Sequence, residues 1–332
     1  MMDADDCGNL PLGSLPLLVY DHGLDPRHTF VTIGDGSIHT RVVPELANNY
    51  YHATPSGWIL LVAPGSSPRT RLWDPRSRES VSLPSMEQKL PVTWKCYLAD
   101  VPTAASCVVI VLDIHKPNFL YCRVGDSRWS THEYDVGEVI VPLECTTTQK
   151  IVIQQGAAMG GKFYFQEKGK LGTIDFSSAT PEFSYLDYQP VDYPEGSNCF
   201  REFLLESQGD IFNVDVFCKG FNPAEILTVE VYKMGLSSST PALTKVDDLG
   251  DRVFLLSYPN RQGLCSASKY GFKGNRVYFN YNVQTREPDG GPICIYDLDD
   301  QSLENLRPCQ GILKLFDNPF WMLPTDQECT GQ

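Results

Sequence analysis

The sequence predicts an all-β fold: a single β-propeller of four-stranded blades, with six blades as the favoured count, closed by the N- and C-terminal strands. The first observation is a recurring unit made of a glycine turn, an apolar-aromatic strand, a short gap, a second strand and an acidic turn. The second is the spacing of that unit. The third is a lone apolar segment near the C-terminus, which has no partner strand beside it in the sequence. A β-sandwich or a mixed β fold is the alternative, because these are ordinary strand and turn residues.

The recurring unit is clearest at residues 271–306, where a Gly-Asn turn signal precedes two runs of strand-forming residues. Two weaker copies lie upstream with the same order of features. The three copies have the turns Ser56-Gly57, Gly160-Gly161 and Gly274-Asn275, the strand pairs 58–62 with 70–73, 162–166 with 171–176 and 277–279 with 293–296, and the closing residues Asp74, Asp175 and Asp297. Each copy is therefore predicted to be a β-meander.

The spacing of the copies indicates a repeat protein. The closing aspartates are 101 residues apart from Asp74 to Asp175 and 122 apart from Asp175 to Asp297. Less regular copies at 107–134 and 209–235 lie between them, so the period is roughly 50–60 residues, near the kelch-type spacing. A period of this size made of strands alone predicts a β-propeller.

The two ends of the chain are predicted to build one blade together. Three short strands over 15–20, 28–35 and 37–43 form no complete unit, and one apolar strand is predicted over 318–324. A propeller avoids an open edge when both termini contribute to one blade, which with five internal units makes six. Five or seven blades are the alternatives, because the unit at 200–250 is irregular; its fourth strand is expected within 237–248.

The domain is predicted to span residues 15–324, between disordered tails at 1–14 and 325–332. No stretch shows sustained helical spacing of apolar residues, so little helix is expected.

The net charge and the cysteine content limit the ligands and the cellular compartment to be expected. A net charge of −14 disfavours nucleic acid or an anionic membrane as the main ligand. The eleven cysteines are odd in number and show no zinc spacing, which favours free thiols in a reducing compartment. The N-terminus lacks the basic start and apolar stretch of a secretory signal. We therefore expect the protein in the cytoplasm, the nucleus or both.

No catalytic motif is present in the sequence. It contains no G-x-S-x-G elbow, no phosphate loop and no H-E-x-x-H zinc pair, and its six histidines are not paired at a ligand spacing. Asp297, Asp299 and Asp300 lack the frame of a calcium loop and are predicted to form a turn. We expect a non-enzymatic protein without cofactor or metal. The alternative is an enzyme or a small-ligand sensor that uses side chains meeting at the axial channel.

The candidate binding loops are two long connections that contain proline and other turn-forming residues, 83–93 and 187–198. The second is rich in tyrosine and acid, which suits recognition of a basic protein partner because tyrosine supplies contact area at low entropic cost. The candidate partner-binding residues are Tyr188, Asp192, Tyr193 and Glu195. The alternative is an ordinary solvated turn, with the neighbouring Phe183 and Tyr185 facing inward from a strand.

Five phrases of the sequence resemble a known family. LGDRVFLL (249–256), GFKGNRVYF (271–279), ICIYDLDD (293–300), FWMLP (320–324) and LPLLVY (15–20) look like the KIB-type β-propeller domain of plants, formerly a plant domain of unknown function. The resemblance covers about residues 15–324. In many relatives the domain follows an F-box, so the resemblance implies a kelch-like receptor that holds a target protein for ubiquitination. Only about fourteen residues precede the first strand here, so we expect no F-box and only an indirect link to ubiquitin-ligase components.

Overall fold

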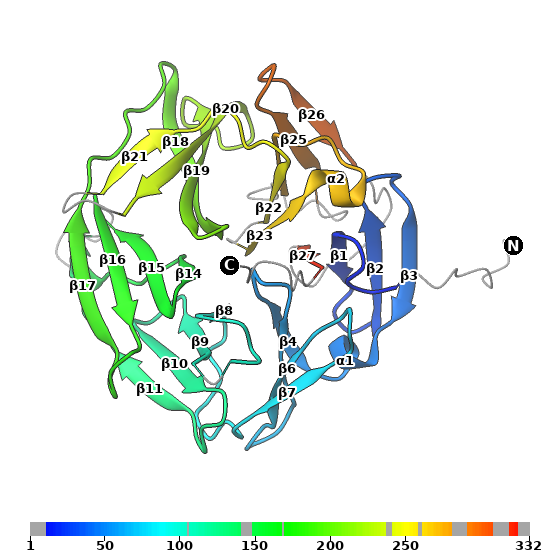
Figure 1. Ribbon diagram of the computed structural model, residues 1–332, viewed down its shortest axis with the longest axis vertical. Coiled ribbons are helices and arrows are strands. Elements are labelled where there is room, and N and C mark those ends of the chain that lie inside the picture. Colours follow the sequence, from blue (N-terminus) through cyan, green and yellow to red (C-terminus); the bar gives the residue numbers. More distant parts are fainter. Residues whose placement is uncertain are drawn as a thin grey trace, which may run out of the picture.

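The computed structural model of the chain is a ring of six β-sheets around a central axis, as Figure 1 shows. The structure describes residues 11–104, 106–140, 148–167, 169–236, 241–257, 261–280, 291–307 and 319–324. The sheets follow one another around the ring as blades 1 to 6. The predicted all-β propeller with six blades is confirmed.

The first three blades are regular four-stranded antiparallel sheets, whose strands are named in order from the axis outwards. Blade 1 contains β27 (Phe320–Met322), β1 (Leu17–Asp21), β2 (Arg27–Thr32) and β3 (Ile38–Val42). Blade 2 contains β4 (Tyr50–Ala53), β5 (Ile59–Val62), β6 (Thr70–Trp73) and β7 (Ser80–Leu83). Blade 3 contains β8 (Trp94–Leu98), β9 (Val108–Asp113), β10 (Asn118–Arg123) and β11 (Ser130–Glu133).

The other three blades complete the ring. Blade 4 contains β14 (Ala157–Met159), β15 (Lys162–Glu167), β16 (Lys170–Asp175) and β17 (Glu182–Asp187). Blade 5 contains β18 (Ser197–Ser207), β19 (Asp210–Lys219), β20 (Ile226–Gly235) and β21 (Ala242–Lys245). Blade 6 contains β23 (Arg261–Ser266), β22 (Arg252–Ser257), β24 (Arg276–Asn280), β25 (Ile293–Asp297) and β26 (Leu303–Leu306). A small hairpin of β12 (Glu138–Ile140) and β13 (Thr148–Lys150) lies in the connection between blades 3 and 4.

Helices contribute little to the fold. The two helices of the described residues, α1 (Pro44–Ala47) and α2 (Ala267–Tyr270), have four residues each, in agreement with the low helix content expected from the sequence. None of the helices in the described part of the chain is long and apolar enough to cross a membrane.

The recurring unit of the sequence corresponds to the second and third strands of blades 2 and 4, and to the third and fourth strands of blade 6, β24 and β25. In blades 2 and 4 its glycine turn joins the first strand to the second, as between β14 and β15, and in blade 6 it precedes β24. In all three blades its closing aspartate begins the turn to the outermost strand. Each closing aspartate accepts a hydrogen bond from the backbone N–H two residues on: Arg76 to Asp74 at 2.8 Å, Ser177 to Asp175 at 2.8 Å and Asp299 to Asp297 at 3.1 Å. This is the Asx-type turn for which aspartate is favoured.

Both ends of the domain meet in blade 1. The strand β27, red in Figure 1, pairs antiparallel with β1, blue, so that residues 17–19 lie opposite residues 320–322. The predicted composite blade is therefore confirmed. The predicted tail over 1–14 falls mostly outside the described residues, but the backbone N–H of Ser14 bonds to Pro11 and Leu12 packs against blades 1 and 2. The predicted tail over 325–332 lies wholly outside them.

Blade 6 departs from the regular pattern by one extra strand. The strand β22 is inserted between β23 and β24 and runs parallel to β24, with Phe254 opposite Val277. Parallel neighbours cannot be joined by a tight hairpin, and here the chain passes through β23 and α2 before it returns in β24. This insertion was not predicted from the sequence.

The hydrophobic core is divided among the six boundaries between blades. Six clusters of buried apolar residues occur in the described part of the chain, and each joins two neighbouring blades. The cluster between blades 2 and 3 contains fourteen buried residues, including Trp58 and Trp129. The cluster between blades 4 and 5 contains five: Ala157, Leu171, Leu204, Ile211 and Met234. Since hydrophobic stabilisation scales with buried apolar area, the described residues give this boundary the smallest apolar contribution of the six.

A polar side chain also links the blades at every boundary near the axis. The six links are the Tyr51 hydroxyl to Asp21 (2.6 Å), the Cys96 N–H to His52 Nδ1 (3.3 Å), Lys95 Nζ to the Gln154 carbonyl, the Leu204 N–H to Gln155 Oε1 (3.3 Å), Gln262 Nε2 to the Leu204 carbonyl, and Trp321 Nε1 to the Leu256 carbonyl (3.0 Å). These hydrogen bonds avoid the cost of about 1–3 kcal/mol that an unpaired buried polar group would carry.

Candidate functional site

The tyrosine-rich connection lies between blades 4 and 5. We call residues 188–196 the recognition segment; it leads from β17, the outer strand of blade 4, to β18, the inner strand of blade 5. The Tyr193 ring is half exposed and packs on Phe200 and Phe217, with ring centroids 5.1 and 5.9 Å away. Tyr193 is therefore anchored on blade 5 and still offers an aromatic surface to a partner.

The other three predicted residues take different positions. The Tyr188 ring packs against the small apolar cluster between blades 4 and 5, and its hydroxyl accepts a hydrogen bond from Gln166 at 3.2 Å. Asp192 and Glu195 are exposed. The structure therefore brings the two tyrosines onto the blade boundary and leaves the two acids facing solvent.

The alternative prediction, that the neighbouring Phe183 and Tyr185 face inward from a strand, holds for only one of the two residues. Phe183, on β17, is partly buried and stacks on His132 with ring centroids 5.5 Å apart. Tyr185, two residues on, is exposed, although its ring lies edge-on to Phe165.

Both predicted binding loops line a pocket. The recognition segment and the start of β21 enclose about 450 Å³, lined by Gln189, Pro190, Val191, Asp192, Tyr232, Pro241, Ala242 and Leu243. The connection after β7 contributes to a second pocket of about 490 Å³, which Leu90, Trp94 and Tyr50 help to line. Both volumes are within the range of small-ligand or side-chain pockets.

Three carboxyl groups form a row across blade 5 beside the recognition segment. Glu202 on β18 lies directly opposite Asp215 on β19, and Asp215 lies directly opposite Glu230 on β20. Residues that are paired across a sheet project from the same face, and like charges in such positions repel. We call these three residues the carboxyl row.

The two inner members of the carboxyl row have only neutral partners among the described residues. Asp215 is 1% exposed, and both of its oxygens accept hydrogen bonds from Asn213 Nδ2 at 3.0 Å. Glu202 accepts one from Gln155 Nε2 at 3.2 Å. Burial raises the pKa of Glu202 to about 7. Burial, with the adjacent Glu202 as a second cause, raises the pKa of Asp215 to about 8. Both groups therefore titrate near neutral pH.

The third member of the row has a cation. Lys245 Nζ lies 2.7 Å from one oxygen of Glu230, and the Tyr232 hydroxyl donates to the other. Tyr232 also lines the pocket beside the recognition segment. The row therefore runs from a charge-balanced end near the pocket to an inner pair with neutral partners.

Glu202, Asp215 and Glu230 were not predicted from the sequence. One signal was present: the strand 209–217 reads GDIFNVDVF, in which Asn213 and Asp215 interrupt an apolar run at alternate positions. Alternate positions of a strand face one side, so two polar residues there indicate a polar face at a blade boundary. Which acids lie opposite Asp215 depends on the register with β18 and β20, which local sequence does not specify.

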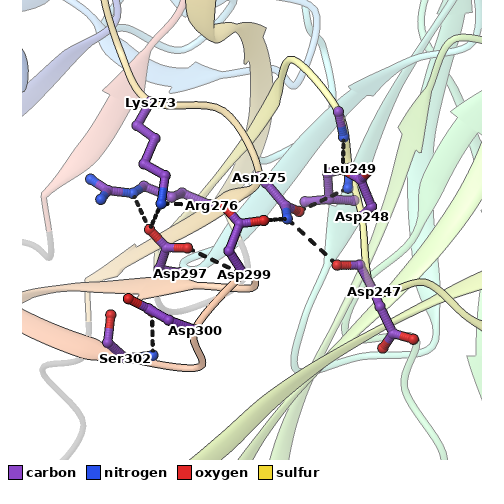
Figure 2. A network of polar contacts seen from close by, with 11 residues as sticks. Asp247, Asp248, Leu249, Lys273, Asn275, Arg276, Asp297, Asp299, Asp300 and Ser302 are labelled. Atoms are coloured by element: carbon purple, nitrogen blue, oxygen red, sulfur yellow. Dashed lines mark hydrogen bonds and ion pairs between the residues drawn. The ribbon is translucent and has the colours of Figure 1, made fainter.

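The residues that carry the family-like phrases form a second polar network, in blade 6 (Figure 2). Asn275 has a positive φ of 58° and is 6% exposed; its Oδ1 accepts from the Leu249 N–H at 2.8 Å, and its Nδ2 donates to Asp299 at 2.7 Å. Gly274 lies so close to the turn before β22 that a Cβ there would be 2.5 Å from the Gly250 carbonyl. This network fixes the start of β24 against the start of β22.

The aspartates of the same network stabilise a turn. Lys273 Nζ and Arg276 Nε lie 2.7 and 2.9 Å from Asp297. Burial alone would raise the pKa of Asp297, but these two cations outweigh it and lower the pKa. Asp300 accepts a hydrogen bond from the Ser302 N–H at 3.0 Å, as Figure 2 shows. The prediction that these aspartates form a turn is confirmed. No group of three or more potential metal ligands is found among the described residues.

Comparison with known proteins identifies a family match. The family model described as KIB1-4 beta-propeller matches residues 30–297. No curated protein matches the chain.

Similar chains also occur among solved structures. Dihydro-heme d1 dehydrogenase NirN in complex with DHE has 12% identity and a TM-score of 0.34, over 96% of this chain and 56% of that chain. Apo AztD from Citrobacter koseri has 11% identity and a TM-score of 0.37, over 92% of this chain and 97% of that one. A functionally unknown protein from Desulfotomaculum acetoxidans has 8% identity and a TM-score of 0.42, over 93% and 99%. The chain thus spans little more than half the length of the NirN chain.

Proposed function

Because the chain belongs to the KIB1-4 beta-propeller family, we propose that it is a non-enzymatic protein-interaction module that binds a partner through the recognition segment. The resemblance to plant receptor propellers supports a finer form of this proposal. In that form the protein holds a target as the receptors of plant F-box proteins do, in the cytoplasm or nucleus. Its link to ubiquitin-ligase components is then indirect.

The observation that carries the proposal is the anchored, half-exposed Tyr193 between two exposed acids, Asp192 and Glu195. Aromatic residues held rigidly at a surface are typical of interaction hot spots, because little side-chain entropy is lost on binding. The acids favour a basic partner and disfavour an acidic one. The pocket of about 450 Å³ beside them offers a place for one partner side chain.

The experiment is affinity purification of the tagged full-length protein from plant cells with a proteasome inhibitor present, followed by mass spectrometry. Wild type is compared with a variant that combines Tyr193→Ala and Asp192→Asn. We expect discrete partners that are recovered with wild type and lost with the variant. Recovery of Skp1-like and cullin subunits together with them would support the ligase-linked form. Partners without those subunits would support a stand-alone binding module.

A matched control is Val92→Ser, which changes an exposed apolar residue of the other binding loop. It should keep the partners that the Tyr193 variant loses. If the variant at 192 and 193 retains the full set of partners, the recognition segment is not the binding surface and the proposal is wrong.

A further inference from the structure

Among the described residues, the boundary between blades 4 and 5 combines the smallest apolar cluster with two neighbouring carboxyls, of which Asp215 is buried and Glu202 is half-buried. The five residues of that cluster contrast with ten or more at each other boundary. Glu202 and Asp215 occupy adjacent strands of this boundary and face each other across the sheet. A weakly packed boundary that also holds ionisable groups is the part of the ring most sensitive to their charge.

Glu202 and Asp215, which have no cation partner among the described residues, cannot both ionise at low cost. Ionising one places a charge in a poorly solvated site, and ionising the second adds repulsion between like charges. Such pairs lose their protons in two steps, and the second proton is held to a higher pH than an isolated carboxyl would hold it. The amide partners, Gln155 and Asn213, stabilise one negative charge and cannot neutralise a second.

Asn213 provides an independent observation on this site. It is 1% exposed and uses its Nδ2 on Asp215, while its Oδ1 has no hydrogen-bond partner among the described residues. An unpaired buried oxygen costs about 1–3 kcal/mol, and admitting water would remove that cost. Closing the boundary therefore leaves this oxygen without a hydrogen bond, and entry of water at this point would be favourable.

The groups that face the pair come from each element packed around it. They are Glu230 and Tyr232 of β20, Glu167 of β15, Tyr188 and Tyr193 of the recognition segment, and Lys245, which is bound to Glu230. Apart from Lys245, all of these groups are acidic or neutral, so none of them offsets the charge of the ionised pair. The charges of Glu202 and Asp215 also raise the pKa of Tyr188, after burial as the main cause.

We propose that Glu202 and Asp215 are protonated in the closed protein, and that loss of their protons to solvent releases the middle of the recognition segment from blade 5. The strands β18, β19 and β20 are paired without interruption on both sides of Asp215, over Cys199–Ser207 of β18 and Ile211–Phe217 of β19, so they cannot separate readily there. The recognition segment is held at its two ends by backbone hydrogen bonds, from the Tyr188 N–H to the Gly169 carbonyl at 2.9 Å and from the Gly220 N–H to the Gly196 carbonyl at 2.7 Å. Between these ends it is held by the ring contacts of Tyr193, which is a weaker attachment. The protein therefore presents its binding surface in two forms, closed at lower pH and open at higher pH. This inference rests on the proposed function only in that it assigns partner binding to the recognition segment.

The test is hydrogen–deuterium exchange of peptides spanning 188–196 in the purified full-length protein without a partner. Rates are corrected for the intrinsic effect of pH. Between about pH 6 and about pH 8.5 we expect the opening equilibrium of the segment to increase on the order of tenfold or more, since each unit of pKa difference between two states is a tenfold change. In Asp215→Asn and in Glu202→Gln, which keep the shape and remove one ionisation, this pH dependence should be at least halved on a logarithmic scale.

Asp187→Asn is the matched control, because it removes a carboxylate with 85% exposure next to the segment. It should keep the wild-type pH dependence. The wild-type measurement alone is decisive if a variant does not fold: exchange that is independent of pH after correction overturns the proposal. Persistence of the full pH dependence in both folded variants also overturns it. Because no partner is present, neither outcome depends on whether the segment binds one.

Discussion

Asp215 shows how a single side chain can be well ordered and still destabilising when charged. It is fully buried, and its only described partner is the Asn213 amide. The folded-state pKa values of about 8 for Asp215 and about 7 for Glu202 lie above those of free carboxyls. A raised folded-state pKa means that the folded protein binds the proton more tightly than the unfolded chain. The stabilisation by protonation is complete below about pH 4 and is lost as the pH rises through 7 to 8.

The variant Asp215→Asn should therefore differ from wild type only at higher pH. Asparagine cannot ionise, so at about pH 5 we expect free energies of unfolding within about 1 kcal/mol of each other, and at about pH 9 a variant more stable by roughly 1–3 kcal/mol. Urea denaturation at several pH values measures this difference. A variant that is equally destabilised at all pH values would show that Asp215 is ionised and well compensated in the folded protein.

Asn275 combines two separate requirements at one position, a positive φ and two side-chain hydrogen bonds. Asn275→Gly removes the hydrogen bonds but accepts the backbone conformation, whereas Asn275→Ala removes the hydrogen bonds and strains the backbone. We expect a loss of about 2 kcal/mol for glycine and about 1 kcal/mol more for alanine. Chemical denaturation of the three proteins gives both values. Equal losses for glycine and alanine would contradict a contribution from the left-handed backbone.

At the scale of elements, the strands of the blades explain both the rigidity of the ring and why only part of it could be predicted from the sequence. The second and third strands of each blade are largely buried and form apolar runs, so residues such as those of β9 and β19 were predicted. The inner strands β4 and β14 carry Tyr-Tyr-His-Ala and Ala-Ala-Met, which lack such a run. Part of their packing is with other blades, and local sequence does not record those contacts.

The candidate site was predictable to the same limited extent. Composition indicated that the segment containing Tyr188 and Tyr193 is a surface connection, and the structure places it there. The carboxyl row was missed because it exists only through the register of three strands. A shift of one residue in that register would turn Asp215 to the other face, so the row is a property of pairing and not of composition.

Gly263 in β23 illustrates how closely an inner strand is packed. A Cβ at Gly263 would lie 2.0 Å from Leu323 Cδ1, and Leu323 is itself buried. Gly263→Ala should cost about 1–3 kcal/mol in wild type and much less in a Leu323→Ala background, where the space is free. A double-mutant cycle of unfolding free energies measures the coupling. Gly235→Ala is the control, since its Cβ would meet only an ordinary contact at 3.6 Å; additive effects of Gly263→Ala and Leu323→Ala would refute the clash.

At the scale of the whole molecule, stability depends on closing the ring. Each boundary between blades buries its own cluster and carries its own polar link. Because every blade of a closed ring contributes to two boundaries, the loss of one boundary also affects its neighbours. The C-terminal segment closes the ring by joining β27 to β1 and by packing Trp321 and Leu323 against blade 6. Without β27, the edge of β1 would be left open, and open edges promote aggregation.

A chain ending at residue 318 should therefore lose more than the local contacts of six residues. It removes the pairing of residues 17–19 with residues 320–322 and the hydrogen bond from Trp321 to the Leu256 carbonyl. We expect a marked loss of soluble monomer and of cooperative unfolding, measured by size-exclusion chromatography and thermal denaturation. A chain ending at residue 324 keeps β27 and should behave as wild type. If the shorter chain unfolds cooperatively with only a small loss of stability, the blades are stable without closure and the ring behaves as an open array of repeats.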